Sequence, residues 1–197
     1  MRISFFCLIF LVFCSVAFCV EEIKVDNIVV TSGRAYVVGP KGIDVGTKYY
    51  IDRDYVVNTL PKELIGATFI MTANDDKNSI GEDFLKFSVN RPVKVWLARD
   101  SRGDEGKGGK IPDWLSKAKG WTRHEDMKID VSDANMGFFI LNSKEFEKGL
   151  IVLGGNADPP SAGHGSQYLV LLTPTEKLSV ESKYKIISAW AKLKSDI

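Results

Sequence analysis

Flat aromatic rings and planar polar groups gather in one stretch of the chain. Its members are Trp96, Arg99, Asp100, Arg102, Trp114 and Trp121. An indole can lie against the C–H face of a sugar ring, and carboxylate and guanidinium groups reach sugar hydroxyls. Arg99 or Arg102 could also pair bidentately with the carboxylate of an acidic sugar. The stretch predicts a carbohydrate site. The alternative is a structural cluster in which Trp114 folds back over the outer face of a sheet near Trp96.

A second candidate is the oxygen-rich tripeptide Asn74-Asp75-Asp76. Ca²⁺ takes six to eight oxygen ligands from carboxylates and carbonyls, so this loop could contribute to a structural calcium site. Its spacing does not match an EF-hand loop. The alternative is a turn in which Asn and Asp side chains bond their own backbone.

Catalytic motifs are not evident in the sequence. His124 and His164 are the two histidines, and Gly163-His164-Gly165-Ser166 lacks the strand–turn–helix context of a serine nucleophile. The densest acidic groups, which lie in turn-like contexts, are Asp52, Asp54, Asp75 and Asp76. We therefore expect a non-catalytic protein with no cofactor other than the possible Ca²⁺.

The N-terminus has the form of a secretory signal peptide. Arg2 precedes an uncharged run from Ile3 to Cys19, and Ala17 and Cys19 stand where cleavage before Val20 requires small residues. We expect residues 1–19 to be removed and the protein to be secreted or periplasmic, with no membrane contact after cleavage. An uncleaved membrane anchor is the alternative, since the run is close to the length of a spanning helix.

Cleavage changes the cysteine count and the charge. Cys7, Cys14 and Cys19 all lie in the leader, so the mature chain would have no disulfide and no thiolate site. Losing Arg2 would reduce 26 basic residues to 25, equal to the 25 acidic ones. A balanced charge argues against nucleic-acid binding, which usually shows a basic excess.

Short apolar runs separated by Gly, Pro, Asn and Asp predict an all-β fold. The expected strands are 28–30, 35–38, 68–72, 84–89, 93–98, 138–141, 150–153 and 168–172. Single helical turns are expected after Pro61 and Pro112. Within 93–98, Val93, Val95 and Leu97 share one face, which predicts a core face and places Trp96 on the outer face. We interpret residues 20–175 as one β-sandwich or jelly roll.

The last segment, 176–197, has a different pattern. Apolar residues recur at helical spacing with lysines between them, which predicts an amphipathic C-terminal helix; they are Val180, Tyr184, Ile187, Trp190 or Ala191, and Leu193. Such a helix would dock on the sandwich or, alternatively, pack on a partner or a membrane surface.

Several motifs resemble a known family. They are 50–55, 60–70, 72–77, 95–102, 112–115, 120–121 and 153–156 followed by Tyr168. In this order they are similar to bacterial secreted galactose-binding-like domains of the discoidin-type jelly-roll kind, over roughly Val45 to Thr173. The resemblance implies a jelly roll, often with structural Ca²⁺, that serves as an accessory to polysaccharide lyases and glycosidases.

These observations lead to three functional hypotheses. The first is a secreted non-catalytic module that binds a polysaccharide or surface glycan. The second is a structural or adhesion protein of the cell envelope that binds a protein partner through the sandwich and the C-terminal helix. The third, which the sequence favours least, is a lyase or hydrolase, which would need His, Tyr, Arg or paired carboxylates in one cleft.

Overall fold

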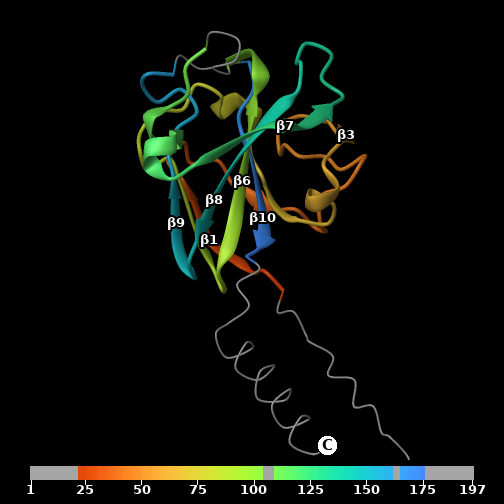
Figure 1. The fold of residues 1–197 in the computed structure, drawn as a ribbon. Coiled ribbons are helices and arrows are strands. Elements are labelled where there is room, and N and C mark those ends of the chain that lie inside the picture. The colour runs from red at the N-terminus through yellow and green to blue at the C-terminus, as the bar shows by residue number, and fades with distance from the viewer. Residues whose placement is uncertain (1–21, 104–108, 162–164, 176–197) are drawn as a thin grey trace, which may run out of the picture.

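Two antiparallel sheets face each other across an apolar core (Figure 1). The computed structural model describes residues 22–103, 109–161 and 165–175, so the predicted leader and the predicted C-terminal helix lie outside the described residues. The smaller sheet has the order β1-β5-β9, and the larger has the order β2-β4-β10-β6-β8-β7-β3. The strands are β1 (Val25–Val30), β2 (Val37–Val38), β3 (Val57–Thr59), β4 (Thr68–Met71), β5 (Leu85–Val89), β6 (Val93–Asp100), β7 (Thr122–Val131), β8 (Phe139–Phe146), β9 (Gly149–Leu153) and β10 (Leu169–Pro174).

The first core fills the space between the two sheets. Val93, Val95 and Leu97 of β6 point into it, as their alternation predicts, and Phe87 of β5 faces them from the smaller sheet. Val170 of β10 lies opposite Leu97 across the strand pair. The all-β sandwich is therefore confirmed, with its core on the predicted face of β6.

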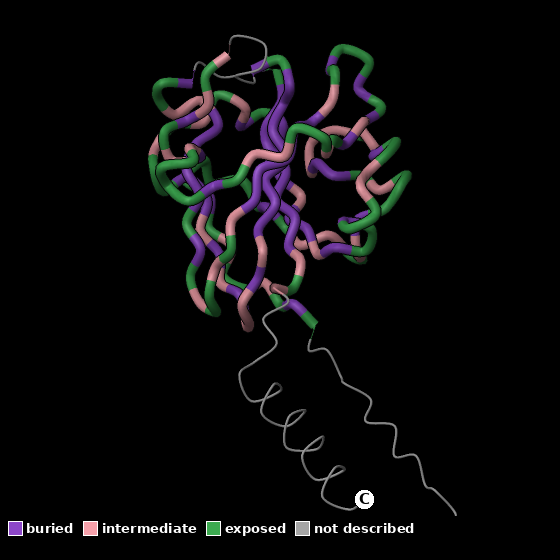
Figure 2. Tube along the Cα trace, in the orientation of Figure 1, coloured by how far each residue is buried: buried purple, intermediate pink, exposed green. Residues whose placement is uncertain are grey.

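A second core covers the opposite face of the larger sheet. Segment 43–67 lies over this face and contributes Ile43, Tyr49 and Tyr50, which pack with Phe139 and Leu171 from the strands. Because both faces are covered, almost every residue of β6 and the first four of β10 are buried, and these strands run through the buried centre in Figure 2. The sheet is thus the middle layer of three.

Two strands were missed by the sequence patterns. β3 has three residues, and β7 has the polar sequence TRHEDMKIDV with little alternation. β7 pairs with β8, its register shifts between His124 and Lys128, and β3 pairs with only its last residues. The beginning of β7 is therefore an edge within the described sheet. Polar residues suit an edge, because charged side chains hinder further strand pairing.

Short 3₁₀ turns connect the strands. Those predicted after Pro61 and Pro112 are present as η1 (Lys62–Leu64) and η5 (Asp113–Leu115), and the others are η2 (Asn74–Asp76), η3 (Ser101–Gly103) and η6 (Lys117–Lys119). In the described ranges, no helix is long and apolar enough to cross a bilayer.

Removing a core side chain from β6 should destabilise the whole sandwich. Leu97 is fully buried, so Leu97→Ala should lower the free energy of unfolding by about 2–5 kcal/mol in denaturant titration. Leu150→Ala is the matched control, because Leu150 is 66% exposed on β9 and its loss should change stability by less than about 0.5 kcal/mol. Equal effects of the two variants would contradict this account of the core.

Candidate functional site

The predicted tryptophan cluster is divided between two faces of the larger sheet. Trp96 belongs to the second core, with 6% of its surface exposed, and its Nε1 donates to Thr173 Oγ1 at 3.0 Å. The ring lies 4.9 Å from the His124 ring, and Lys94 Nζ lies 4.4 Å from its centroid. Trp96 is thus on the face opposite the first core, as expected, but it is covered.

Trp114 packs on the other side, so the alternative that places it near Trp96 is wrong about its location. Its ring centroid lies 5.9 Å from that of Trp121 and 6.0 Å from that of Tyr168, both in the first core. Trp114 Nε1 donates to Gly155 O at 3.0 Å. A Cβ at Gly154 would overlap the indole, so the Gly154-Gly155 turn provides the flat backbone surface on which the ring lies. The η5 turn sets this position because Pro112 fixes the backbone just before it.

Arg99, near the end of β6, is hydrogen-bonded to the segment after β6 and to the loop after β9. Its side chain is buried and donates to the Oδ1 and carbonyl oxygen of Asn156, to Ser161 Oγ and to Gly103 O. Asn156 in turn donates to Lys77 O and Ser166 O. These contacts tie the end of β6 to the loop after β9, so Arg99 is oriented toward the protein interior.

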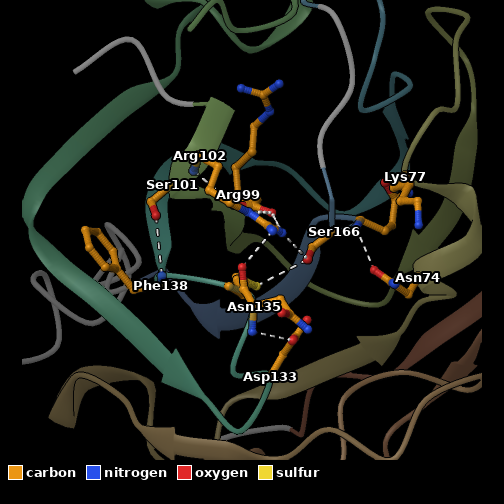
Figure 3. Close-up of polar contacts among 12 residues, drawn as sticks. Asn74, Lys77, Arg99, Ser101, Arg102, Asp133, Asn135, Phe138 and Ser166 are labelled. Atoms are coloured by element: carbon orange, nitrogen blue, oxygen red, sulfur yellow. Dashed lines mark hydrogen bonds and ion pairs between the residues drawn. The ribbon is translucent and has the colours of Figure 1, made fainter. Parts of the chain in front are cut away.

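Asp100 and Arg102 form a bidentate pair at the same end of the sandwich. Arg102 also donates to Asn135 O at 2.8 Å and to Ser166 Oγ at 3.2 Å (Figure 3). Burial opposes ionisation of Asp100, but the hydrogen bonds and charge of Arg102 outweigh it and lower the pKa of the carboxyl. The pair therefore closes the loops around Ser166, and both carboxylate oxygens of Asp100 are engaged within the protein.

The tripeptide predicted to bind calcium forms η2 and contacts cationic and hydroxyl groups. Asp76 accepts from Ser32 Oγ, Arg34 Nε and Tyr36 Oη, and Asp75 pairs with Arg53. Burial raises the pKa of Tyr36, and the hydrogen bond to Asp76 raises it further. Among the described residues no group of three or more His, Cys, Asp or Glu is placed to hold a metal. Calcium binding remains a prediction here.

A cleft brings Trp114 and Trp121 together with charged side chains. It has a volume of about 330 Å³, and we call it the aromatic cleft. Its lining consists of Glu82, Asp113, Trp114, Lys119, Trp121, Lys144, Phe146, Val152 and Gly154. Trp121 and Phe146 meet edge to face at 6.1 Å between centroids, and Lys144 Nζ lies 5.2 Å from the Phe146 ring. The cleft therefore combines an aromatic wall with both hydrogen-bond donors and acceptors.

Sequence reasoning found the two tryptophans but not their partners in this cleft. Lys144 and Phe146 lie in the second half of β8, beyond the predicted strand 138–141, where alternation with Glu145 and Glu147 was the available signal. The predicted residues Arg99, Asp100 and Arg102 lie in the loop network instead.

Comparison with known proteins gives the fold but no family. No protein-family model and no curated protein matches the chain. A solved β-glucuronidase from glycoside hydrolase family 2 is similar over 76% of this chain and 14% of that chain, with 19% identity and a TM-score of 0.61. A GH138 enzyme targeting pectin rhamnogalacturonan II is similar over 80% and 18%, with 16% identity and a TM-score of 0.46. Of the two, the first is close enough to compare folds, and it shows this architecture as a small part of a carbohydrate-active enzyme.

Neutralising Asp100 should make stability depend less on pH. Asp100→Asn removes the charge paired with Arg102, so the free energy of unfolding at pH 7 should fall by about 1–3 kcal/mol. Because the folded pKa is lowered, the ionised form stabilises the fold above the unfolded pKa of about 3.9, and this contribution is lost as pH falls through the folded value.

Denaturant titrations from pH 7 to pH 2 should therefore show the two proteins converging in acid. Asp26→Asn, at an exposed position of β1, is the control and should follow the unmodified protein throughout. A constant gap between Asp100→Asn and the unmodified protein at every pH would contradict the pairing argument.

Proposed function

We propose that this chain is a secreted, non-catalytic β-sandwich module that binds carbohydrate in the aromatic cleft. The observation that carries the proposal is the convergence of Trp114, Trp121 and Phe146 with lysine and acidic side chains in one open cavity of about 330 Å³. Ligand pockets combine apolar walls with a few placed polar groups and typically measure about 300–1,000 Å³. Sugars match this surface because each ring has an apolar face and a rim of hydroxyls.

The comparison supports the resemblance seen in the sequence. A β-glucuronidase contains this architecture in 14% of its length, as accessory domains of the galactose-binding-like kind would. The proposal assigns that accessory role to this chain, with its ligand site in the aromatic cleft rather than around Arg99, Asp100 and Arg102.

The positions of the acids favour binding over hydrolysis. Glycosidases usually need one carboxyl held protonated in an apolar environment and a second on the other side of the bond. Glu82 and Asp113 both lie at the exposed rim, and Asp113 Oδ2 is 3.6 Å from Lys119 Nζ. Exposed carboxylates, which remain ionised at neutral pH, suit hydrogen bonding to hydroxyls.

A second candidate function is an envelope protein that binds a protein partner. The outer face of the smaller sheet favours it, because Val29, Leu150 and Val152 are 59%, 66% and 40% exposed. Val29 and Val152 lie on either side of Lys86 in the strand register. This face would serve adhesion if the cleft binds no glycan.

The first experiment is a screen of the purified protein against neutral and acidic polysaccharides, with tryptophan fluorescence as the readout and with or without Ca²⁺. We expect saturable quenching by one class of glycan, because Trp114 lines the cleft and is partly exposed. A reducing-sugar assay on the same mixtures should show no product. No quenching by any glycan, in a protein shown to be folded, would favour the protein-partner hypothesis, and sugar release would establish an enzyme.

A matched pair of substitutions tests the location. Glu82→Ala removes a rim acceptor, so affinity for the responding glycan should fall about three- to tenfold, the effect of one hydrogen bond. Glu63→Ala removes an equally exposed acid from η1 and should leave affinity unchanged. Equal affinities of the two variants would place the ligand elsewhere.

A further inference from the structure

We infer that the binding site continues around the edge of the larger sheet into a second cleft, and that its ligand is a neutral oligosaccharide long enough to occupy both clefts. The inference rests on the proposed function and deepens it, because it names the charge and the minimum extent of the ligand. Lys144 lines both clefts and marks where they meet.

The second cleft lies on the opposite face of the sheet from the aromatic cleft. It has a volume of about 410 Å³ and is lined, besides Lys144, by Lys94, Gly120, Thr122, His124, Ser143 and Glu145. The register places Lys94 opposite Glu145, and Ser143 between Trp96 and Thr122, so their side chains share one face. This is the face that the second core covers farther along the sheet, and here it is left open.

The edge at the beginning of β7 separates the two clefts. Lys144 Nζ donates to Lys119 O at 2.8 Å, which holds the lysine across the turn leading into β7. Gly120 has a positive φ of 86°, and a Cβ at this position would lie 3.6 Å from Lys144 Cε. A Cβ would fit here, so the positive φ is what favours glycine, and Lys144 is the side chain that a ligand crossing the edge would contact.

The charges of the two clefts balance. Three lysines, Lys94, Lys119 and Lys144, stand against three acids, Glu82, Asp113 and Glu145. Burial and the nearby Lys94 lower the pKa of His124, so its imidazole is neutral at pH 7 and adds no charge. A polyanion would gain little from such a surface, whereas hydroxyls can donate to the acids and accept from the lysines.

The second cleft also has an intrinsic reporter that does not depend on tryptophan. His124 Nε2 lies 2.8 Å from Ser143 Oγ, and both residues line the cleft. Ligand reaching this cleft would perturb the ring signals of His124 in an NMR spectrum. Occupation of the aromatic cleft alone would change tryptophan fluorescence and leave these signals in place.

The test is a length series on the full chain. Xylo- and manno-oligosaccharides of one to six units are titrated, with oligogalacturonides of equal length as the anionic comparison. We expect affinity to rise at least tenfold between the short and the long neutral members, His124 signals to shift with the long members alone, and the anionic series to bind no more tightly.

Two variants localise the effect. Glu145→Ala should weaken the six-unit ligand about three- to tenfold and leave the two-unit ligand unaffected, whereas Lys144→Ala should weaken both. Lys62→Ala, exposed in η1, is the control and should match the unmodified protein.

The outcomes separate this inference from the proposed function. If glycans quench tryptophan fluorescence, but affinity does not depend on their length and the His124 signals do not shift, the ligand does not reach the second cleft. Binding in the aromatic cleft would still be supported. Tighter binding of the anionic series would overturn the neutral ligand. No response from any glycan would overturn both the inference and the proposed function.

Discussion

The larger sheet is buried on both faces, and this constraint determines where the protein can meet a ligand. Side chains of β6 and β10 alternate between two cores, so nearly all of them are committed to packing. Groups for binding must therefore come from an end of the sheet or from its edge. The beginning of β7 provides such an edge, and the two clefts that share Lys144 lie on either side of it.

At the loop end, ionic groups are used to hold the structure together. Arg99 donates hydrogen bonds to oxygens of Gly103, Lys110, Asn156 and Ser161, and both carboxylate oxygens of Asp100 accept from Arg102. A buried charge is tolerated when hydrogen bonds replace its hydration, and removing one partner is costly because the other charge is left buried. Arg99, Asp100 and Arg102, which we predicted as ligand-binding residues from their side-chain chemistry, thus hold the loops together. The two clefts are lined instead by lysines and acids that no sequence motif singles out.

The sequence patterns predicted eight of the strands and the core face of β6, because buried strands carry apolar residues with period two. They failed for β7, whose edge position imposes no apolar alternation. They also did not show that Trp96 is buried, because its contacts with Thr173 and His124 join residues far apart in the sequence. Trp114 and Trp121 were recognised as candidate site residues. Their partners Lys144 and Phe146 come from another strand, so only the folded register brings them together.

Because both cores pack on the larger sheet, we expect them to unfold together. Loss of either core would expose one face of β6 and β10 to water. The sandwich and the 43–67 layer should form a single cooperative unit, with the slowest amide exchange in those two strands. The beginning of β7 lies at an edge and its register shifts after His124, so we expect faster amide exchange there than in β6 and β10. A ligand bound across that edge would therefore slow amide exchange at the beginning of β7.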